Sequence, residues 1–349
     1  MTETFFTPVP EAVGVEITSR CDLACRHCFN LSGAGRRQEL SLDDLMYLFD
    51  QVQAMGLTGV RISGGEPTLH PDFPAIIRAA VSRGLRVSLN TNGLYAPRTG
   101  RKIADLDIAL FLVSLDGLRS ANDRVRGTGV FDRVVATVRW LRSLGRKVIV
   151  GAHLNHGNVA DVEGLIALAA ELGADIKFAP LRLIGRAREL MADEAPTPAD
   201  FCTAVQTITR LRGAYPRTRI YTDFDILQPA TGASQTLSPS RASCPAGRSM
   251  LNVSYDGYVY PCAFLATPQR EFAAGHLREA PLLSLWRESP VFDPFRTLEK
   301  DVRCRGCFAY GRACVGGCVA VSYFVAGRLD ARDPTCFVEH VRPPEAIRD

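Results

Sequence analysis

The sequence has no long uninterrupted apolar stretch. No run approaches the roughly 18 residues that suggest a membrane-spanning helix, and the N-terminal residues lack the basic start and apolar segment of a secretory signal. We therefore expect a cytoplasmic protein that has no membrane partner.

An excess of charge of one sign is also missing. The 41 Lys and Arg residues against 37 Asp and Glu residues give a formal net charge of +4. This charge is too small to favour a nucleic acid as partner on electrostatic grounds. The partners must therefore be inferred from particular sites.

Cysteine, in contrast, is abundant. Eleven cysteines are many for a cytoplasmic chain, in which disulfides are disfavoured, and an odd number cannot form a closed set of disulfides. Metal binding or redox chemistry is the leading explanation. With 349 residues the chain also exceeds the roughly 250–300 at which one hydrophobic core stops growing, so we expect one large domain and a smaller one.

Short β-rich runs alternate with helical patterns over the first two-thirds of the chain. The expected strands cover residues 13–18, 60–63, 86–90, 110–115, 148–154 and 177–183. One helical pattern follows a capping box that begins at Ser41, and others cover residues 130–144, 159–172 and 198–212. This alternation is typical of parallel strands and predicts the α/β class, with a partial (β/α)6 TIM-like barrel.

Domain boundaries follow from a change in composition. We expect the barrel over residues 1–215, a linker over residues 216–243 with a turn-rich, mobile part at 230–240, and a cysteine-rich domain over residues 244–349. Periodicity is weak in this last part. Because such a segment has few apolar residues for a core, we expect it to depend on metal for folding.

Three cysteines follow the first expected strand in the spacing C-x3-C-x2-C: Cys21, Cys25 and Cys28. In a β/α barrel the active site lies where the strands end, so this triplet would lie at the barrel mouth. Three thiolates leave one iron of a 4Fe-4S cube open to bind another group. On spacing alone, a zinc site or a set of core thiols remains an alternative.

A glycine-rich turn follows the second expected strand, at the same end of the barrel. It contains Gly64, Gly65 and Glu66. Two glycines let the backbone approach a ligand closely, and a carboxylate can hold an ammonium group. An ordinary turn is the alternative.

Together, the cysteine triplet and the Gly-Gly-Glu turn resemble the radical S-adenosylmethionine (SAM) superfamily, over about residues 10–215. The resemblance implies that Cys21, Cys25 and Cys28 hold a 4Fe-4S cluster whose open iron binds SAM. It also implies that Gly64, Gly65 and Glu66 meet the amino group of SAM.

The same resemblance implies further contacts with SAM. His27 would lie near the adenine, and Ser114 and Arg126 would hold the carboxylate of SAM. A solvated loop charge is the alternative for Arg126. Asp116 would reach the ribose or the substrate, with a turn-capping aspartate as the alternative. The Thr-Asn-Gly sequence at 91–93 fits either the family pattern or a common turn.

Seven further cysteines resemble the SPASM domain, which carries two auxiliary iron–sulfur clusters in many radical SAM enzymes. The resemblance implies that the first auxiliary cluster has three ligands, Cys244, Cys262 and Cys318, and that the second has four, Cys304, Cys307, Cys314 and Cys336. One gap, between Cys307 and Cys314, is a residue longer than the family usually has. Two closed zinc sites are a poor alternative, because seven thiolates do not divide into two sets of four.

Cys202 lies outside both sets. We expect it to be a buried core thiol, with a hydrogen-atom donor or a fourth cluster ligand as alternatives.

The resemblance implies an enzyme that reductively cleaves SAM to a 5′-deoxyadenosyl radical, which removes a hydrogen atom from the substrate. A flavodoxin or ferredoxin would supply the electron, and three 4Fe-4S clusters would be present. The auxiliary clusters suggest oxidation, so we expect an oxidoreductase. The candidate bases are Asp116, His153, His156 and Glu66, of which the family role makes Glu66 a poor base. Ala263 follows Cys262 where sulfatase-maturing relatives have an aspartate, which makes formylglycine formation doubtful.

The substrate class is the least determined part. Many SPASM enzymes modify ribosomally made peptides, by cross-linking or dehydrogenation, and a separate leader-peptide-binding protein would then assist. Dehydrogenation or epimerisation of a small aminoglycoside or aminocyclitol is an alternative. From another class, the alternative is a non-catalytic protein whose clusters only relay electrons.

Overall fold

The structure is a computed structural model that describes residues 6–33, 35, 37–95, 97–223, 244–310 and 314–338. Its centre is one sheet of ten strands in the order β10-β9-β8-β1-β2-β3-β4-β5-β6-β7. Strands β1 to β7 are parallel neighbours. They are β1 (Ala12–Glu16), β2 (Gly59–Ser63), β3 (Arg86–Thr91), β4 (Leu110–Ser114), β5 (Val148–Leu154), β6 (Asp175–Pro180) and β7 (Ile220–Thr222).

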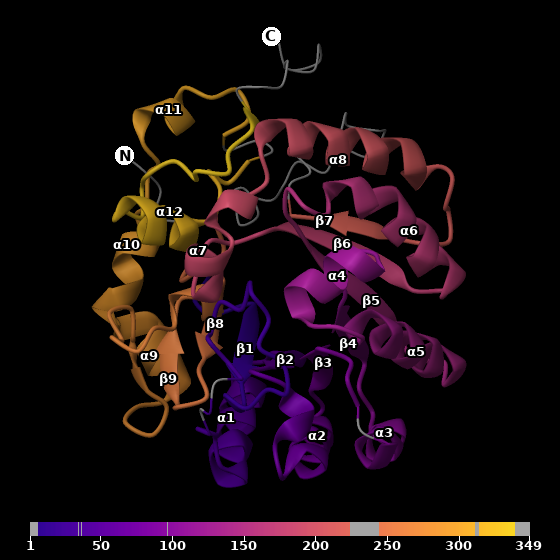
Figure 1. The fold of residues 1–349 in the computed structure, drawn as a ribbon. Helices are drawn as coiled ribbons and strands as arrows, with labels where there is room; N and C mark the ends of the chain where they lie inside the picture. Colours follow the sequence, from indigo (N-terminus) through magenta and orange to yellow (C-terminus); the bar gives the residue numbers. More distant parts are fainter. Residues whose placement is uncertain are drawn as a thin grey trace.

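Helices follow the parallel strands and pack on one face of the sheet (Figure 1). They are α1 (Leu42–Ala54), α2 (Phe73–Ser82), α3 (Pro97–Ala104), α4 (Arg119–Arg126), α5 (Val130–Ser143), α6 (Val162–Glu171), α7 (Arg186–Leu190) and α8 (Pro198–Arg212). Both α1 and α8 begin with a capping box, at Ser41 and at Thr197. The partial barrel of alternating strands and helices that the sequence predicts is therefore confirmed.

Alternation along each strand separates the core from an inner polar face. In β5, Val148, Val150, Ala152 and Leu154 are buried, whereas the residues between them, His153 included, are half-buried. The buried set packs under the helices in the main apolar core. The other set faces the inside of the partial barrel.

The C-terminal part continues the same sheet. Strand β8 (Met250–Val253) pairs in parallel with β1, and β9 (Tyr258–Tyr260) and β10 (Gly275–His276) follow as antiparallel neighbours. The helices of this part are α9 (Leu282–Glu288), α10 (Asp293–Arg296), α11 (Val302–Arg305) and α12 (Val319–Ala326). In Figure 1 these orange and yellow segments lie beside β1 and α1.

The expectation of a sparse core after Cys244 is wrong for the first half of this segment. Leu277, Trp286 and Phe292 are fully buried and belong to the main core. The reason is that β8 pairs with the open edge of β1. The helices and strands that follow β8 can therefore pack against apolar residues of the barrel. A second, smaller apolar cluster lies between Ile184 and α12.

Single 3-10 turns complete the described elements, at Pro67–Leu69, Val159–Asp161, Ala192–Glu194, Ala263–Leu265 and Pro290–Phe292. The short strand β7 lies inside the range that the sequence suggests as linker, and residues 224–243, with the turn-rich part at 230–240, lie outside the described residues. Among the described helices, none combines the length and apolar character that crossing a bilayer requires.

Candidate iron–sulfur and cofactor site

The cysteine triplet lies on the loop that follows β1, at the carboxyl end of the parallel strands. Cys25 is buried, and Cys21 and Cys28 are half-buried. Burial, with smaller increases from Glu66 and Cys25, raises the pKa of Cys21 to about 12. Burial also raises the pKa of Cys25, with smaller increases from Asp116 and Cys28. Metal binding would replace the protons of such buried thiols.

Three N–H groups point at these sulfur atoms. The backbone nitrogen of Leu23 lies 3.4 Å from Sγ of Cys21, and Nδ2 of Asn92 lies 3.9 Å from the same atom. The Arg126 Nη1 atom lies 4.0 Å from Sγ of Cys25. Such donors stabilise the reduced form of a cluster bound to the sulfurs.

The Gly-Gly-Glu turn packs directly against the start of the cysteine loop. A Cβ atom on Gly64 would lie 2.4 Å from the carbonyl oxygen of Thr18, and one on Gly65 would lie 2.0 Å from that of Arg20. The backbone nitrogen of Gly65 donates to Thr18, and that of Glu66 donates to Arg20. Glycine is therefore required here to bring the loops after β1 and β2 together.

The carboxylate of Glu66 is 1% exposed and accepts four hydrogen bonds. The donors are the backbone nitrogen and the hydroxyl of Thr68, at 3.2 and 2.7 Å, the hydroxyl of Thr91 at 2.9 Å, and the backbone nitrogen of Asn92 at 2.7 Å. Burial raises the pKa of Glu66, whereas these donors lower it. Glu66 thus connects the turns after β2 and β3. An ammonium group that binds the carboxylate of Glu66 would have to share it with the hydrogen-bond donors of these turns.

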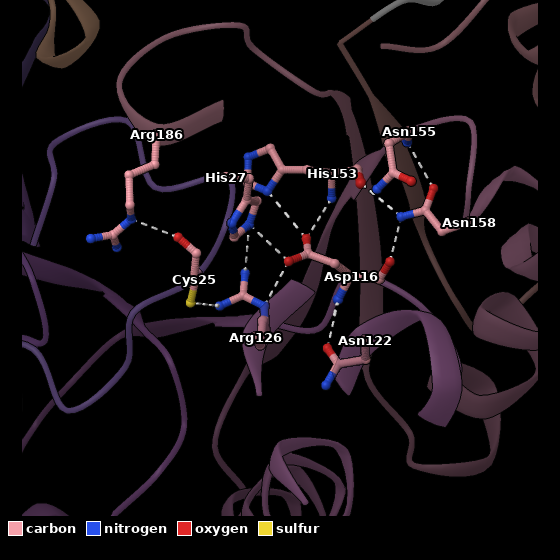
Figure 2. A network of polar contacts seen from close by, with 9 residues as sticks. All are labelled: Cys25, His27, Asp116, Asn122, Arg126, His153, Asn155, Asn158 and Arg186. Atoms are coloured by element: carbon pink, nitrogen blue, oxygen red, sulfur yellow. Dashed lines mark hydrogen bonds and ion pairs between the residues drawn. The ribbon is translucent and has the colours of Figure 1, made fainter. Parts of the chain in front are cut away.

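Asp116, just after β4, is the centre of a buried polar network (Figure 2). Its carboxylate accepts from Arg126 Nε at 2.6 Å, from His27 Nε2 at 2.8 Å and from the backbone nitrogen of His153 at 2.8 Å. The Nδ1 atom of His153 lies 3.3 Å from it. Burial raises the pKa of Asp116, but Arg126 and His27 outweigh burial and hold it well below its usual range. Asp116 therefore orients its neighbours and is a poor proton acceptor.

His27 links this network to the cysteine loop. Burial lowers the pKa of His27. Its Nε2 atom lies 2.8 Å from the carboxylate of Asp116 and 3.3 Å from Nη2 of Arg126. Its Nδ1 atom is buried and has no hydrogen-bond partner among the described residues. The ring packs edge-on against His153, with centroids 5.3 Å apart.

The segment after β6 clamps the cysteine loop from the other side. The backbone nitrogen of Arg186 donates to the carbonyl of Cys28 at 3.0 Å, and its side chain donates to the carbonyls of Cys25 and Ser32 at 2.9 and 2.8 Å. Its Nη2 atom is buried without a partner in the described ranges. Gly185 has a φ of 58°, and a Cβ atom there would lie 2.3 Å from the carbonyl oxygen of Phe29.

The other seven predicted ligand cysteines gather in two groups. Burial raises the pKa of Cys262 well above its usual value, and the neighbouring Cys318 and Cys244 raise it further. Burial likewise raises the pKa of Cys314, with further increases from two neighbouring thiols, and raises that of Cys304 to about 11. The first group therefore holds Cys244, Cys262 and Cys318, and the second holds Cys304, Cys307, Cys314 and Cys336.

Charged side chains connect the first group to the barrel. Asp333 accepts from the backbone nitrogen of Cys318 at 2.7 Å, and Arg182, just after β6, lies 3.6 Å from the same carboxylate. Phe29 of the cysteine loop packs edge-on against Phe264, two residues after Cys262, with centroids 4.9 Å apart. The two iron–sulfur regions therefore share a packed boundary.

The remaining predicted residues fall in different places. Ser114 is half-buried at the end of β4, opposite Gly151 of β5. His156 faces Asp200 at the start of α8, with Nδ1 3.0 Å from the carboxylate, and so does not join the network of Asp116. Cys202 is half-buried on α8.

The sequence did not single out three charged residues that the structure encloses, Glu16, Arg186 and Lys300. Glu16 and Lys300 are 1% and 2% exposed, and Arg186 is half-buried. The signal in the sequence is position alone, because Glu16 lies near the end of the expected strand 13–18 and Arg186 follows the expected strand 177–183.

The site fits SAM and iron–sulfur clusters on two observations. All eleven cysteines are free, and ten of them form three groups rather than disulfides. Beside the first group, three buried polar atoms lack partners within the described part of the chain, and a polar ligand could satisfy such atoms. These atoms are Nδ1 of His27, Nη2 of Arg186 and Oε2 of Glu16.

Thiols grouped in this way, at the mouth of a partial barrel, define an iron–sulfur enzyme. A family model described as the radical SAM superfamily matches residues 15–169, and one described as an iron–sulfur cluster-binding domain, SPASM, matches residues 244–308. The chain belongs to the radical SAM superfamily and carries a C-terminal SPASM domain.

Known proteins of this class match the chain over nearly its whole length. The mycofactocin maturase MftC of Mycobacterium tuberculosis is 33% identical over 332 residues, which cover 94% of this chain and 83% of the relative. The PqqA peptide cyclase of Ruegeria pomeroyi is 31% identical over 346 residues, which cover 94% and 87%.

Solved structures show the same fold at low sequence identity. SuiB of Streptococcus suis, bound to S-adenosylmethionine, has a TM-score of 0.78 at 20% identity, with 94% of this chain and 77% of that chain covered. The anSMEcpe structure with bound AdoMet and the Cp18Cys peptide has a TM-score of 0.73 at 16% identity, with 94% of both chains covered.

Proposed function

We propose that this radical SAM enzyme is an oxidoreductase that matures a ribosomally made peptide, by a cross-link or a dehydrogenation, in natural-product biosynthesis. The observation that carries the proposal is the similarity, at 33% and 31% identity, to proteins named as a mycofactocin maturase and a PqqA peptide cyclase. A fold shared with SuiB, whose structure was also solved with the precursor peptide SuiA, agrees with a peptide substrate.

The proposal assigns the cysteine groups to three 4Fe-4S clusters. Cys21, Cys25 and Cys28 would hold the cluster that binds SAM, and the groups around Cys262 and Cys314 would hold the first and second auxiliary clusters. The bound groups supply a 5′-deoxyadenosyl radical that removes a hydrogen atom, and an acceptor for the electron that the substrate then loses. A flavodoxin or ferredoxin would be the reductant, and a separate protein would bind the leader peptide.

The residues of the chain would bind and orient the reactants. His27 and Arg126 lie against the cysteine loop, where the adenine and the carboxylate of SAM are expected. Gly64, Gly65 and Ser114 would complete the SAM pocket. The buried surroundings keep water from reactive species.

His153 is the best placed group to take the proton that an oxidised substrate loses. Its Nδ1 atom faces Asp116 at 3.3 Å, so Nδ1 carries the proton and Nε2 keeps a free electron pair. The side chain is 39% exposed on the inner face of the barrel, whereas Asp116 is fully buried. Asp116 would therefore position His153, and His153 would act on the substrate.

The test is an anaerobic assay of the reconstituted full chain with SAM, a reductant and a panel of precursor peptides. We expect 5′-deoxyadenosine and a peptide lighter by two hydrogen atoms, both read by mass spectrometry. The variant His153→Gln should still form 5′-deoxyadenosine but lose the modified peptide by about 100-fold, the typical contribution of a general base. Turnover of a free aminosugar with no peptide present would contradict the peptide assignment.

A further inference from the structure

A buried lysine lies between the two auxiliary cysteine groups. Lys300, which precedes α11, is 2% exposed. Its Nζ atom donates to the hydroxyl of Ser322 at 3.0 Å and to the carbonyls of Leu329 and Ala331 at 3.0 and 2.7 Å. An ammonium group has three N–H donors, and all three are used. Lys300 is therefore held as a cation and has no lone pair with which to bind iron.

This cation has no carboxylate partner within ion-pair distance in the part of the chain that the structure describes. The nearby Asp333 is directed elsewhere, since it accepts from the backbone of Cys318 at 2.7 Å and from the backbone and hydroxyl of Thr335 at 2.8 and 2.6 Å. A buried charge without a counter-charge is strongly unfavourable in a protein interior. A buried cation of this kind needs an anion close by.

Besides Asp333, the nearby groups that can become anionic are the thiols of both auxiliary groups. Burial lowers the pKa of Lys300, whereas Asp333 and the sulfur atoms of Cys304, Cys244 and Cys318 raise it. Cys304 belongs to one group and Cys244 and Cys318 to the other. Lys300 and Cys244 also line the same small hollow.

We propose that the ammonium group of Lys300 is the shared internal counter-charge of the two auxiliary clusters and raises the reduction potential of both. This inference rests on the proposed function, because it requires the auxiliary clusters. A fixed positive charge in a medium of low polarity favours the state of a nearby cluster that carries one more electron. With Lys300 in place, the auxiliary clusters accept an electron more readily.

The neighbouring cations do not substitute for Lys300. Arg182 lies 3.6 Å from Asp333, and its charge is offset by that carboxylate. Arg248 donates to the carbonyls of Phe295 and Leu298 and is only partly enclosed. Lys300 alone among these three acts on thiols of both groups.

The test compares reduction potentials in the reconstituted full chain, measured by anaerobic redox titration with EPR detection and no peptide. Lys300→Met and Lys300→Gln remove the charge, Lys300→Arg keeps it, and Ser322→Ala removes one hydrogen-bond acceptor while keeping the charge. We expect both auxiliary potentials to move to more negative values in the first two variants and to stay near wild type in the last two. The potential of the SAM-binding cluster serves as an internal reference.

Arg303→Met is the matched surface control. Arg303 is exposed and adjoins Cys304, so it carries the same charge at a place where water screens it. Its removal should move the potentials less than removal of Lys300. An equal shift in Arg303→Met, or wild-type potentials in fully loaded Lys300→Met and Lys300→Gln, overturns the proposal.

A further variant covers the case in which Lys300→Met and Lys300→Gln bind no auxiliary clusters. Ser322→Asp keeps the lysine but places a carboxylate against its ammonium group, so it should lower the potentials or the iron content, while Lys300→Arg and Ser322→Ala keep both. If Lys300→Arg also loses iron, the site requires the shape of the lysine side chain rather than its positive charge, and the proposal is overturned. Because no peptide is used, an error in the substrate assignment leaves this result unaffected.

Discussion

At the scale of single residues, two buried carboxyl groups near the cysteine loop are held in opposite protonation states. Arg126 and His27 outweigh burial at Asp116 and keep its pKa well below the usual range. At Glu16, burial dominates over a hydrogen bond from Asn30 and raises the pKa from 4.5 to about 8. The difference comes from the presence of a partner cation at Asp116 and its absence from the described surroundings of Glu16.

The raised pKa of Glu16 predicts a stability that falls as pH rises. In the folded chain Glu16 keeps its proton up to about pH 8, whereas the unfolded chain loses it near pH 4.5. Between these values the folded state binds more protons, so the free energy of unfolding decreases by up to about 1.4 kcal/mol per pH unit from this group. Glu16→Gln should remove this slope and be more stable than wild type at pH 8.

Thermal unfolding of both proteins at pH 6 and pH 8 measures this effect. Glu11→Gln, at an exposed position just before β1, is the control and should leave the pH dependence unchanged. If Glu16→Gln and wild type have the same melting temperature at both pH values, Glu16 is ionised in the folded chain.

The buried ion pair between Asp116 and Arg126 can be compared with an exposed pair in the same region. The side chains of Asp116 and Arg126 are 0% and 5% exposed, whereas those of Asp132 and Arg119 are 59% and 60% exposed. We expect Asp116→Asn to cost about 3–5 kcal/mol, since it leaves a buried guanidinium without its counter-ion. Asp132→Asn should cost about 0–1 kcal/mol.

Denaturant unfolding of the two variants checks this difference. Asp116→Asn should in addition lower peptide product formation, because the amide keeps a single acceptor oxygen, which cannot serve both Arg126 and His153. Equal stability of the two variants would mean that Arg126 finds another partner when Asp116 is neutral.

At the scale of elements, the segment from β6 to α7 connects the cysteine loop to the C-terminal part. Arg186 binds the carbonyls of Cys25 and Ser32, and Ile184 packs in the small apolar cluster that contains Cys262. A shift of this segment therefore reaches the SAM-binding site and the first auxiliary site together.

Removal of the Arg186 side chain should loosen the cysteine loop. Arg186→Gln leaves the carbonyl of Ser32 without a donor, at a cost of about 1–3 kcal/mol, whereas the carbonyl of Cys25 keeps the backbone nitrogen of Cys28. We expect faster loss of iron from the SAM-binding cluster to a chelator, followed by absorbance of the iron complex. Arg188→Gln, on the exposed face of the same helix, is the control and should behave like wild type. Identical rates in the two variants would show that Arg186 does not hold the loop.

The sequence predicts the regular elements well where period and caps agree. The strand at Val148–Leu154 and the helix at Pro198–Arg212 match their predicted bounds, because a short apolar run rich in β-branched residues marks the first and a capping box marks the second. Strand β7 has three residues and β8 has four. Strands this short show no recognisable alternation in the sequence. They pair with the edge strands of the barrel, and these edges exist only once the barrel has folded.

The same limit applies to the site. Cysteine spacing indicates the group of Cys21, Cys25 and Cys28, because these thiols lie on one loop. The division of the other seven cysteines into two groups came from the family resemblance, because members such as Cys244 and Cys318 lie far apart in sequence. Lys300 and Arg186 become visible only through contacts with residues distant in sequence, such as Ser322 and Cys25. No local pattern distinguishes either from a solvated surface charge.

At the scale of the whole molecule, one sheet joins the barrel to the C-terminal part. Strand β8 pairs with β1 along four registered positions, and the main core extends from Val13 to Phe337. The segment after Lys300 differs, because it has two short helices and contributes little to that core. We therefore expect the metal dependence that the sequence suggests for the entire C-terminal part only in its last section.

Removal of the clusters should affect these two sections differently. In protein treated anaerobically with a chelator, we expect the backbone amides of β1 to β6 and β8 to stay protected from hydrogen exchange, because their sheet and core need no metal. The described backbone amides in 300–310 and 314–338 should exchange faster with solvent. Without a cluster, the cysteine side chains of this section are no longer joined through a metal centre, and contacts between thiols do not replace that crosslink. Mass spectrometry of the same peptides from the loaded protein is the reference. Loss of protection in β8 would show that the sheet itself depends on the clusters, whereas unchanged exchange in 314–338 would show that α12 is held by apolar packing alone.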